Sequence, residues 1–390
     1  MTAIATPDLT EYRPGLIILF GSGESSPTGR KVFDQICREL PPSPRIALLE
    51  TPAGFELNST QVVGRVADFI QQRLQNYHPQ VSVIPARKRG TDYSPDDPEI
   101  VYPLLEANMI FLGPGSPTYT VRQLRYSLAW DYLVARHRLG AALVMASAAM
   151  IAASAFALPV YEIYKVGEDP HWNQGLDFFG IYGLPLVFIP HWNNNDGGAE
   201  LDTSRCFMGQ SRFALLMEML PPYLTVVGID EKTALIVDPH EGICRVAGLG
   251  GVTLIHTGRI HPGASAEADQ VGSGLEEIAD NREAHVHQFQ NGDSFHLTRI
   301  GPFQTPEGGR GLPAEVWHRA LEVESKRSLE VGENLVEEPD EEVLAFVKER
   351  EAARQRKDWA EADRLRVQIA AMGWEVRDKS GGPLVTKRSQ

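Results

Sequence analysis

The alternation of short apolar runs with helical stretches over the first 260 residues constrains the fold most. Several of the runs contain no polar residue, as expected for strands buried on both faces of a parallel sheet. Helical stretches separate them, which predicts an α/β fold with three layers around a mostly parallel sheet. The expected strands are 16–20, 45–50, 81–85, 108–112 and 141–145, and the expected helices are 31–40, 59–77 and 120–138.

Three parts of the chain differ in pattern. Further strands are expected at 186–190, 224–229, 234–238, 244–247 and 252–256, and they complete a first domain over 1–260. Residues 261–337 are irregular: 263–274 resembles a linker, the Asn291-Gly292 turn predicts a hairpin over 285–298, and 330–342 resembles an exposed acidic connector. Residues 338–390 read as a helical hairpin domain.

The helical tail carries start signals for two helices. Asp340 is expected to cap a helix that runs to about Arg356. Asp358 and Glu361 have capping-box spacing, which starts a second helix ending before Gly373. If the two helices fold back on each other, apolar positions 343, 344, 346 and 347 face positions 365, 369 and 372.

Charge divides the chain into an acidic body and a slightly basic tail. The formal net charge is −14, yet residues 341–390 hold 11 Lys and Arg against 9 Asp and Glu. Because an acidic body repels phosphate backbones, any nucleic acid is expected at the tail. The three cysteines lack C-x-x-C spacing, which indicates reduced thiols and fits a cytoplasmic protein.

An uncharged stretch over 140–161 is long enough to span a bilayer. It is rich in alanine and divides into a strand at 141–145 and a helix at 148–157. A buried strand-turn-helix unit is therefore favoured over a membrane span. The first residues do not read as a signal peptide.

Ser147 stands between the apolar strand and the small-residue helix. This arrangement predicts a sharp turn that projects the hydroxyl from the sheet edge. The backbone N–H of Ala148 would then point toward a bound carbonyl oxygen at the positive end of the helix.

A serine nucleophile needs a base. His191 follows the strand at 186–190, and Glu162 follows another short apolar run, so the two could act as base and orienting acid. Gly115, in a glycine-rich loop after the strand at 108–112, is expected to give a second oxyanion donor, with Gly113 as the next choice. Taken singly, each of these residues also fits a structural role; their joint order at strand ends favours catalysis.

These residues resemble Peptidase S51, the cyanophycinase and dipeptidase E group of the class I glutamine-amidotransferase-like, flavodoxin-like fold. The family's G-[ST]-S-A-G-A turn is similar to 145–150, its G-G-G-N-T loop to 113–118, and its G-I-D-E-x-T-A-L segment to 228–235. The resemblance covers about 15–258 and implies a serine peptidase acting on small, often aspartyl, peptides. Both glycines that flank the family serine are replaced here, by Met145 and Ala149.

Residues 349–378 resemble the C-terminal module of cysteinyl-tRNA synthetase, which implies a contact with the tRNA anticodon. The synthetase's catalytic H-I-G-H and K-M-S-K-S signatures are absent from the sequence, so aminoacylation is not expected. Interspersed acidic residues leave a solvated, salt-bridged hairpin as the alternative to an RNA-binding tail. For Trp359, we expect a core position near the helix cap rather than a stacking platform.

The leading hypothesis is a serine-type hydrolase with a small peptide substrate and no cofactor or metal. The rival is an inactive scaffold that binds RNA or a protein partner through residues 338–390. A glutamine amidotransferase is disfavoured because that chemistry normally uses cysteine. Three histidines, His285, His287 and His296, would share a hairpin face and could hold a metal, but a polar edge is the simpler interpretation. A homodimer is left open, and no membrane partner is expected.

Overall fold

The computed structural model describes residues 12–257, 285–335, 339–379 and 382–387. The chain forms two compact units, Met1–Ala320 and Leu321–Gln390. We call the first unit the body; the helical hairpin module inside the second, from residue 339 onward, is the tail.

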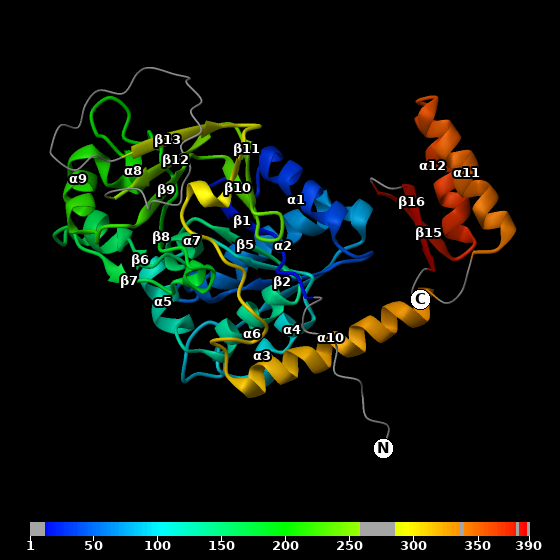
Figure 1. Ribbon diagram of the computed structural model, residues 1–390, viewed down its shortest axis with the longest axis horizontal. Coiled ribbons are helices and arrows are strands. Elements are labelled where there is room, and N and C mark those ends of the chain that lie inside the picture. Colours follow the sequence, from blue (N-terminus) through cyan, green and yellow to red (C-terminus); the bar gives the residue numbers. More distant parts are fainter. Residues whose placement is uncertain (1–11, 258–284, 336–338, 380–381, 388–390) are drawn as a thin grey trace. The chain divides into compact units, whose positions relative to one another are not determined.

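A mostly parallel sheet forms the centre of the body, as the alternating pattern predicts (Figure 1). Its strand order is β14-β11-β10-β1-β5-β4-β2-β3. The five strands from β1 to β3 in this order are parallel, and β10, β11 and β14 are antiparallel additions. The strands are β1 Ile17–Phe20, β2 Arg45–Leu49, β3 Gln80–Ile84, β4 Met109–Leu112, β5 Ala142–Ala146, β10 Thr233–Asp238, β11 Ile243–Gly248 and β14 Ser294–His296.

A second sheet has the order β13-β12-β9-β8. β8 and β9 are parallel neighbours, so their carboxyl ends lie side by side. A short third pair joins β6 to β7. The strands are β6 Phe156–Ala157, β7 Asn173–Gln174, β8 Leu186–Ile189, β9 Thr225–Ile229, β12 Gly251–His256 and β13 His285–Gln290.

Helices cover the large sheet. α1 and α2 bury apolar residues such as Phe33 and Ile70 against β1, β2 and β4, while α3, α4 and α6 lie on the opposite side (Figure 1). Serine side chains at 26, 116 and 127 cap α1, α5 and α6. The helices are α1 Pro27–Glu39, α2 Ser59–Arg73, α3 Pro98–Val101, α4 Pro103–Glu106, α5 Pro117–Leu124, α6 Leu128–Arg138, α7 Ala148–Ala152, α8 Ser204–Phe207, α9 Gly209–Met219 and α10 Ala314–Leu335.

Two expected helices are shorter than the sequence pattern predicts. The stretch 120–138 is broken between α5 and α6, because Tyr126 adopts a left-handed φ of 57° and Ser127 caps a new helix. The stretch 148–157 ends at Ala152 and passes into β6. By contrast, α10 continues to Leu335, so part of the expected acidic connector is helical.

The expected hairpin over 285–298 is wrong, although its turn at Asn291-Gly292 is present. β13 pairs with β12 in the small sheet, and β14 pairs with β11 in the large one. His287 is therefore opposite Leu254 and His296 is opposite Ile243, which does not bring the histidines onto one hairpin face. The expected linker at 263–274 lies outside the described residues.

The tail is an antiparallel helical pair followed by a β-hairpin. Asp340 and Asp358 accept bonds from the N–H groups of Val343 and Glu361, each at 3.2 Å, so both predicted caps are confirmed. Leu344 is 49% exposed and does not join the apolar interface, contrary to expectation. The elements are α11 Glu341–Gln355, α12 Trp359–Ala371, β15 Trp374–Lys379 and β16 Gly382–Lys387.

The uncharged stretch over 140–161 forms β5, α7 and β6 in the body core. Across the described part of the chain, every helix is too short or too polar to cross a bilayer.

Candidate active site

Ser147 lies at the turn between β5 and α7. Its φ of 51° and ψ of −111° fall outside the regions that a non-glycine residue normally occupies. The N–H of Ser147 donates to the Phe20 carbonyl of β1 at 3.1 Å, which fixes the strained turn to the sheet. Met145 and Ala149 are buried beside it, so the turn forms without the two glycines of the resembled family. Such a strained strand-to-helix turn is the geometry of a nucleophile elbow.

His191 reaches Ser147 from the other sheet. It follows β8, and its Nε2 lies 3.0 Å from the Ser147 Oγ. Its backbone N–H donates to the Gly21 carbonyl at 3.2 Å, and its own carbonyl accepts from the Cys206 N–H at 3.2 Å. These bonds join the loops after β1 and β8, which places the imidazole where the two sheets meet.

Glu231 completes a hydrogen-bonded chain of three side chains, Ser147, His191 and Glu231, which we call the relay. Its Oε1 lies 2.9 Å from Nδ1 of His191 and also accepts a bond from Asn194 Nδ2 at 3.0 Å. The Glu231 N–H donates to Asn193 Oδ1 at 2.8 Å. The asparagine loop after His191 thus holds the carboxylate in place. His191 and Glu231 side chains remain 20% and 32% exposed, so solvent reaches the relay.

The prediction of Glu162 as the orienting acid is wrong. Glu162 begins the π-helical turn η4 (Glu162–Val166), and its buried Oε2 has no hydrogen-bond partner within the described structure. Glu162 precedes His191 in the chain, but chain order does not determine which acid reaches the imidazole. The signal for Glu231 was available: it lies in the Gly228-Ile-Asp-Glu231 segment directly after β9, the neighbour of β8.

A second strained segment supports His191. Arg205, Cys206 and Phe207 have consecutive φ values of 57°, 59° and 67°, a left-handed turn built from non-glycine residues. Each such residue costs about 1–2 kcal/mol. The turn places the Phe207 ring 6.0 Å from the imidazole of His191. Backbone strain that persists beside a Ser–His hydrogen bond is typical of a functional site.

Aromatic and acidic groups lie near Ser147 and His191. The ring of Tyr164, from η4, lies 5.2 Å from the ring of Phe207. Glu24, in the loop after β1, was not found by sequence reasoning. Burial raises the pKa of its carboxyl, while its own backbone N–H and the charge of His191 act in the opposite direction. A carboxyl whose pKa is raised by burial thus lies near the Ser147–His191–Glu231 chain.

The two expected oxyanion donors have different local settings. Ala148 is the first residue of α7, where an N–H group has no acceptor within the helix. Gly115 lies in the loop between β4 and α5, and a Cβ there would collide with the Pro52 carbonyl. Packing alone therefore explains this glycine, and its role as a donor stays a prediction.

The cysteines offer no competing nucleophile. Cys37, Cys206 and Cys244 are free and buried. Burial raises the pKa of the Cys206 and Cys244 thiols, which disfavours the reactive thiolate. Within the described ranges, no cluster of three or more His, Cys, Asp or Glu could hold a metal ion.

The fold of the body matches a solved peptidase. A crystal structure of a peptidase from an acI-B1 Actinobacterium aligns with a TM-score of 0.54 and 19% identity, covering 73% of this chain and 98% of that one. A putative peptidase E from Listeria monocytogenes aligns over 60% of this chain and 99% of its own length, with 14% identity and a TM-score of 0.41. The first comparison confirms the expected α/β fold.

The tail is recognised by sequence. Residues 337–383 match the family model of the cysteinyl-tRNA ligase anticodon binding domain. The cysteine--tRNA ligase of Methylocella silvestris is 57% identical over 42 residues, and that of Methanosarcina acetivorans is 48% identical over 54. These matches span 11% and 14% of this chain and only 9% and 11% of the ligases. The chain therefore combines a body that shares the α/β fold of a solved peptidase with a tail that resembles the anticodon module of a tRNA ligase.

Proposed function

We propose that this chain is a serine-type hydrolase that cleaves amide bonds in small peptides. The continuous hydrogen-bonded relay from Ser147 through His191 to Glu231 carries the proposal. A hydroxyl within 3.0 Å of an imidazole that is itself oriented by a carboxylate has the geometry of an activated serine. Small acidic peptides are the substrate class that the family resemblance favours.

In the proposed reaction, Ser147 Oγ attacks the substrate carbonyl carbon while His191 Nε2 accepts the hydroxyl proton. His191 then donates this proton to the leaving amine as the C–N bond breaks, which gives an acyl-enzyme. Water, deprotonated by His191, releases the acid product and restores the Ser147 hydroxyl. Glu231 keeps a proton on Nδ1 of His191 and stabilises the imidazolium that forms in each step.

The negative charge that develops on the substrate carbonyl oxygen needs donors. We assign one to the N–H of Ala148, the residue after the nucleophile, which is the usual donor at a nucleophile elbow. The second is proposed at Gly115, whose loop follows the neighbouring strand β4. Loss of one such donor typically lowers kcat by about 100-fold to 1,000-fold.

A fluorophosphonate probe tests the nucleophile without knowledge of the substrate. We expect the probe to label the parent protein at Ser147, and Ser147→Ala to lose both labelling and cleavage of an acidic dipeptide panel. Ser82→Ala, an exposed serine on β3, is the matched control and should label as the parent does. Equal labelling of parent and Ser147→Ala would refute the proposal.

A second candidate function is RNA binding by the tail, in keeping with the anticodon-domain match. Trp359 is 57% exposed, contrary to the expected core position, and the guanidinium of Arg354 lies 5.7 Å from its ring centre. An exposed ring beside a cation suits base stacking. We expect the full chain to bind tRNA with an affinity that falls steeply with salt and drops about tenfold in Trp359→Ala. Equal tRNA binding by Trp359→Ala and Val367→Ala, an exposed position on the same helix, would contradict it.

A further inference from the structure

A cavity of about 390 Å³ opens between α5, β7 and the loop after β3, apart from the relay residues. Three arginines line it, Arg89, Arg122 and Arg125, together with Tyr126. Thr118 and Asn173 also line it, and Nδ2 of Asn173 donates to the Thr118 hydroxyl at 3.4 Å. No Asp or Glu is among the lining residues, although the chain has a net charge of −14. The cavity therefore concentrates positive charge on an acidic protein.

Two of these positive charges are not neutralised. The terminal nitrogens of Arg125 donate to the Gln174 side-chain oxygen at 2.7 Å and to the carbonyls of Gln174 and Gly175 at 2.6 and 2.7 Å, all uncharged acceptors. Arg122 is exposed, and its guanidinium lies 5.2 Å from the ring centre of Tyr119. Within the described part of the chain, no carboxylate forms an ion pair with either arginine. Uncompensated guanidinium groups in a concave site attract anions.

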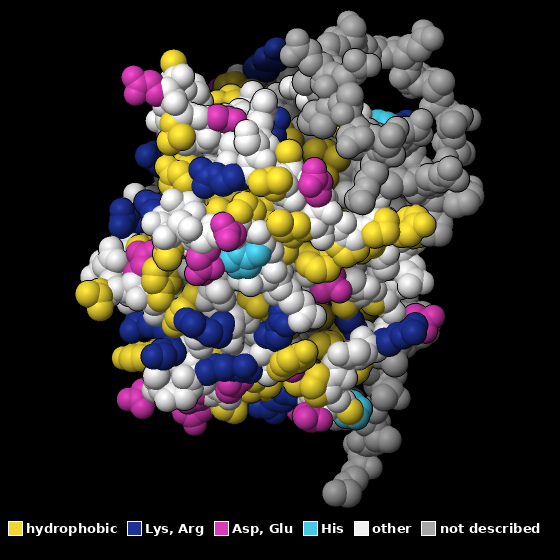
Figure 2. Space-filling view, turned by 90° about the vertical axis from the view of Figure 1, so that its left-hand side faces the viewer, with side chains coloured by type: hydrophobic (Ala, Val, Ile, Leu, Met, Phe, Trp, Pro, Cys, Tyr) yellow, Lys and Arg dark blue, Asp and Glu magenta, His cyan; other side chains and the backbone are white. Residues whose placement is uncertain are grey.

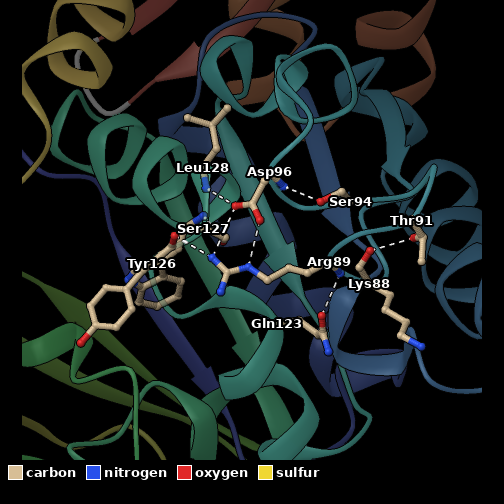
Figure 3. Close-up of polar contacts among 10 residues, drawn as sticks. Lys88, Arg89, Thr91, Ser94, Asp96, Gln123, Tyr126, Ser127 and Leu128 are labelled. Carbon is tan, nitrogen blue, oxygen red and sulfur yellow. Dashed lines mark hydrogen bonds and ion pairs between the residues drawn. The ribbon is translucent and has the colours of Figure 1, made fainter.

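The third arginine is held in a fixed orientation. Arg89 Nε lies 2.9 Å from Asp96 Oδ2, and its Nη2 donates to the Tyr126 carbonyl at 2.6 Å (Figure 3). Asp96 also accepts from the Leu128 N–H at 3.2 Å, which joins this group to the start of α6. The wall formed by Arg89 is thus pre-organised, and a ligand would not have to order it.

Tyr126 shows the strain expected of a functional position. Its φ of 57° interrupts the helical stretch between α5 and α6, and its side chain is 85% exposed at the edge of the cavity. Figure 3 shows its ring directed away from the polar network of Arg89 and Asp96. Tyr126 thus lines the edge of the cavity and also holds Arg89 through its backbone carbonyl.

We propose that this cavity is a binding site for a small oxyanion, a carboxylate or phosphate group of a soluble metabolite or peptide. Arg122 and Arg125 supply the charge, and Thr118 and Asn173 supply neutral hydrogen bonds. The guanidinium fork of Arg122 matches both oxyanions, because each offers two oxygens to parallel N–H donors.

The site is connected to the proposed catalytic turn but does not depend on it. Arg125 holds Gly175, whose N–H donates to Ala155 at 2.9 Å, and the Leu176 N–H donates to Ala152 at the end of α7 at 2.8 Å. An anion in the cavity would therefore contact a segment bonded to the helix that begins after Ser147. Because the binding groups lie outside the relay, Ser147→Ala is expected to bind the anion as the parent does.

Isothermal titration of the full chain in low-chloride buffer tests the site, with inorganic phosphate and succinate as separate probes. We expect at least one probe to bind, Arg122→Gln to weaken its affinity about fivefold to tenfold, and Arg122→Lys to restore only part of it, because an ammonium group keeps the charge but not the paired N–H donors. Arg65→Gln, an exposed arginine on α2, is the matched control and should bind as the parent does. Tighter phosphate binding would identify a phosphorylated ligand, and tighter succinate binding a carboxylate ligand.

Two outcomes would overturn the proposal. One is the absence of binding for both probes. The other is binding of equal strength by the parent, Arg122→Gln and Arg65→Gln, which would mean that the anion binds elsewhere. Thermal melts of each variant show that it is folded, and because Arg122 is exposed we expect no loss of stability from its substitution.

Discussion

The body and the tail place their polar groups over different distances in the chain. In the body, 44 residues separate Ser147 from His191, and 40 more separate His191 from Glu231. In the tail, each helix cap reaches three residues along its own helix. Local contacts leave a pattern in the sequence, and accordingly the tail matches a family model by sequence, whereas the body matches the solved peptidase in its fold at 19% identity. A site whose residues come from distant loops requires a particular arrangement in space. It places fewer requirements on the residues that are adjacent to them in the sequence.

The largest expected effect concerns which acid serves the body's relay. Glu231→Gln should lower the rate of fluorophosphonate labelling by about 1,000-fold or more, since the histidine loses its orienting carboxylate. Glu162→Gln, the matched control, should label within about twofold of the parent because the carboxylate bonded to His191 is that of Glu231, while Glu162 lies in η4. Equal losses in both variants would show that the relay is not the working triad. Labelling rates need no knowledge of the substrate.

Glu231 and Glu162 also show which parts of the site can be predicted from the sequence. The strands and the strand-end positions of Ser147 and His191 follow from apolar runs, whose period depends only on near neighbours. Glu231 required knowing that β9 pairs with β8, and pairing between strands is a long-range property. Arg89 and Arg125 line one cavity although they are far apart in the chain, which is again a long-range property of the fold. The tail's caps were predictable from short motifs, whereas its β15–β16 hairpin was missed.

A second contrast is the response of the two units to acid. His137 is fully buried in the body, with Nε2 bonded to the Tyr182 hydroxyl, and burial lowers its pKa to about 3. Since the unfolded state takes up a proton near pH 6.5 and the folded state does not, this group's stabilising effect is complete above pH 6.5 and is lost as the pH falls toward 3. Between pH 6.5 and 5 the loss is about 2 kcal/mol.

Urea unfolding at pH 7.5 and pH 5.0 measures this loss. We expect His137→Gln to flatten the pH dependence of the body's unfolding free energy between these values, even if the variant is less stable at both. In the tail, burial acts to raise the pKa of Asp378, but Arg350 and Arg354 outweigh it, and the net pKa is lowered. Its stabilising effect persists down to about pH 4 and is lost only below that. An unchanged pH slope in His137→Gln would contradict the assignment of the body's loss of stability to the protonation of His137.

A third prediction concerns the tail's buried charge. Arg350 is 4% exposed and donates to Asp378 through two bonds of 2.8 and 3.1 Å. Asp378→Ala leaves a buried guanidinium without its partner, and because the carboxylate is 41% exposed we expect a cost of about 1–2 kcal/mol in the tail's unfolding. Fluorophosphonate labelling of the body should not change. Glu361→Ala, which removes an exposed pair with Arg364, is the control and should cost far less.

The smallest effect is a gain in stability at the turn between the tail's helices. Lys357 has a φ of 62°, and the N–H groups of Lys357 and Asp358 donate to the carbonyls of Arg354 and Ala353, each at 2.9 Å. This bonding is a Schellman motif, whose left-handed residue is usually glycine. Lys357→Gly should relieve the strain of the side chain and stabilise the tail by about 0.5–1 kcal/mol, partly offset by the greater entropy of the unfolded chain.

In the body, the left-handed Cys206 is buried and joined to His191, so Cys206→Gly removes packing as well as strain and should destabilise instead. Urea melts of the two variants test this opposition, and a gain in both would mean that backbone strain alone governs the two turns.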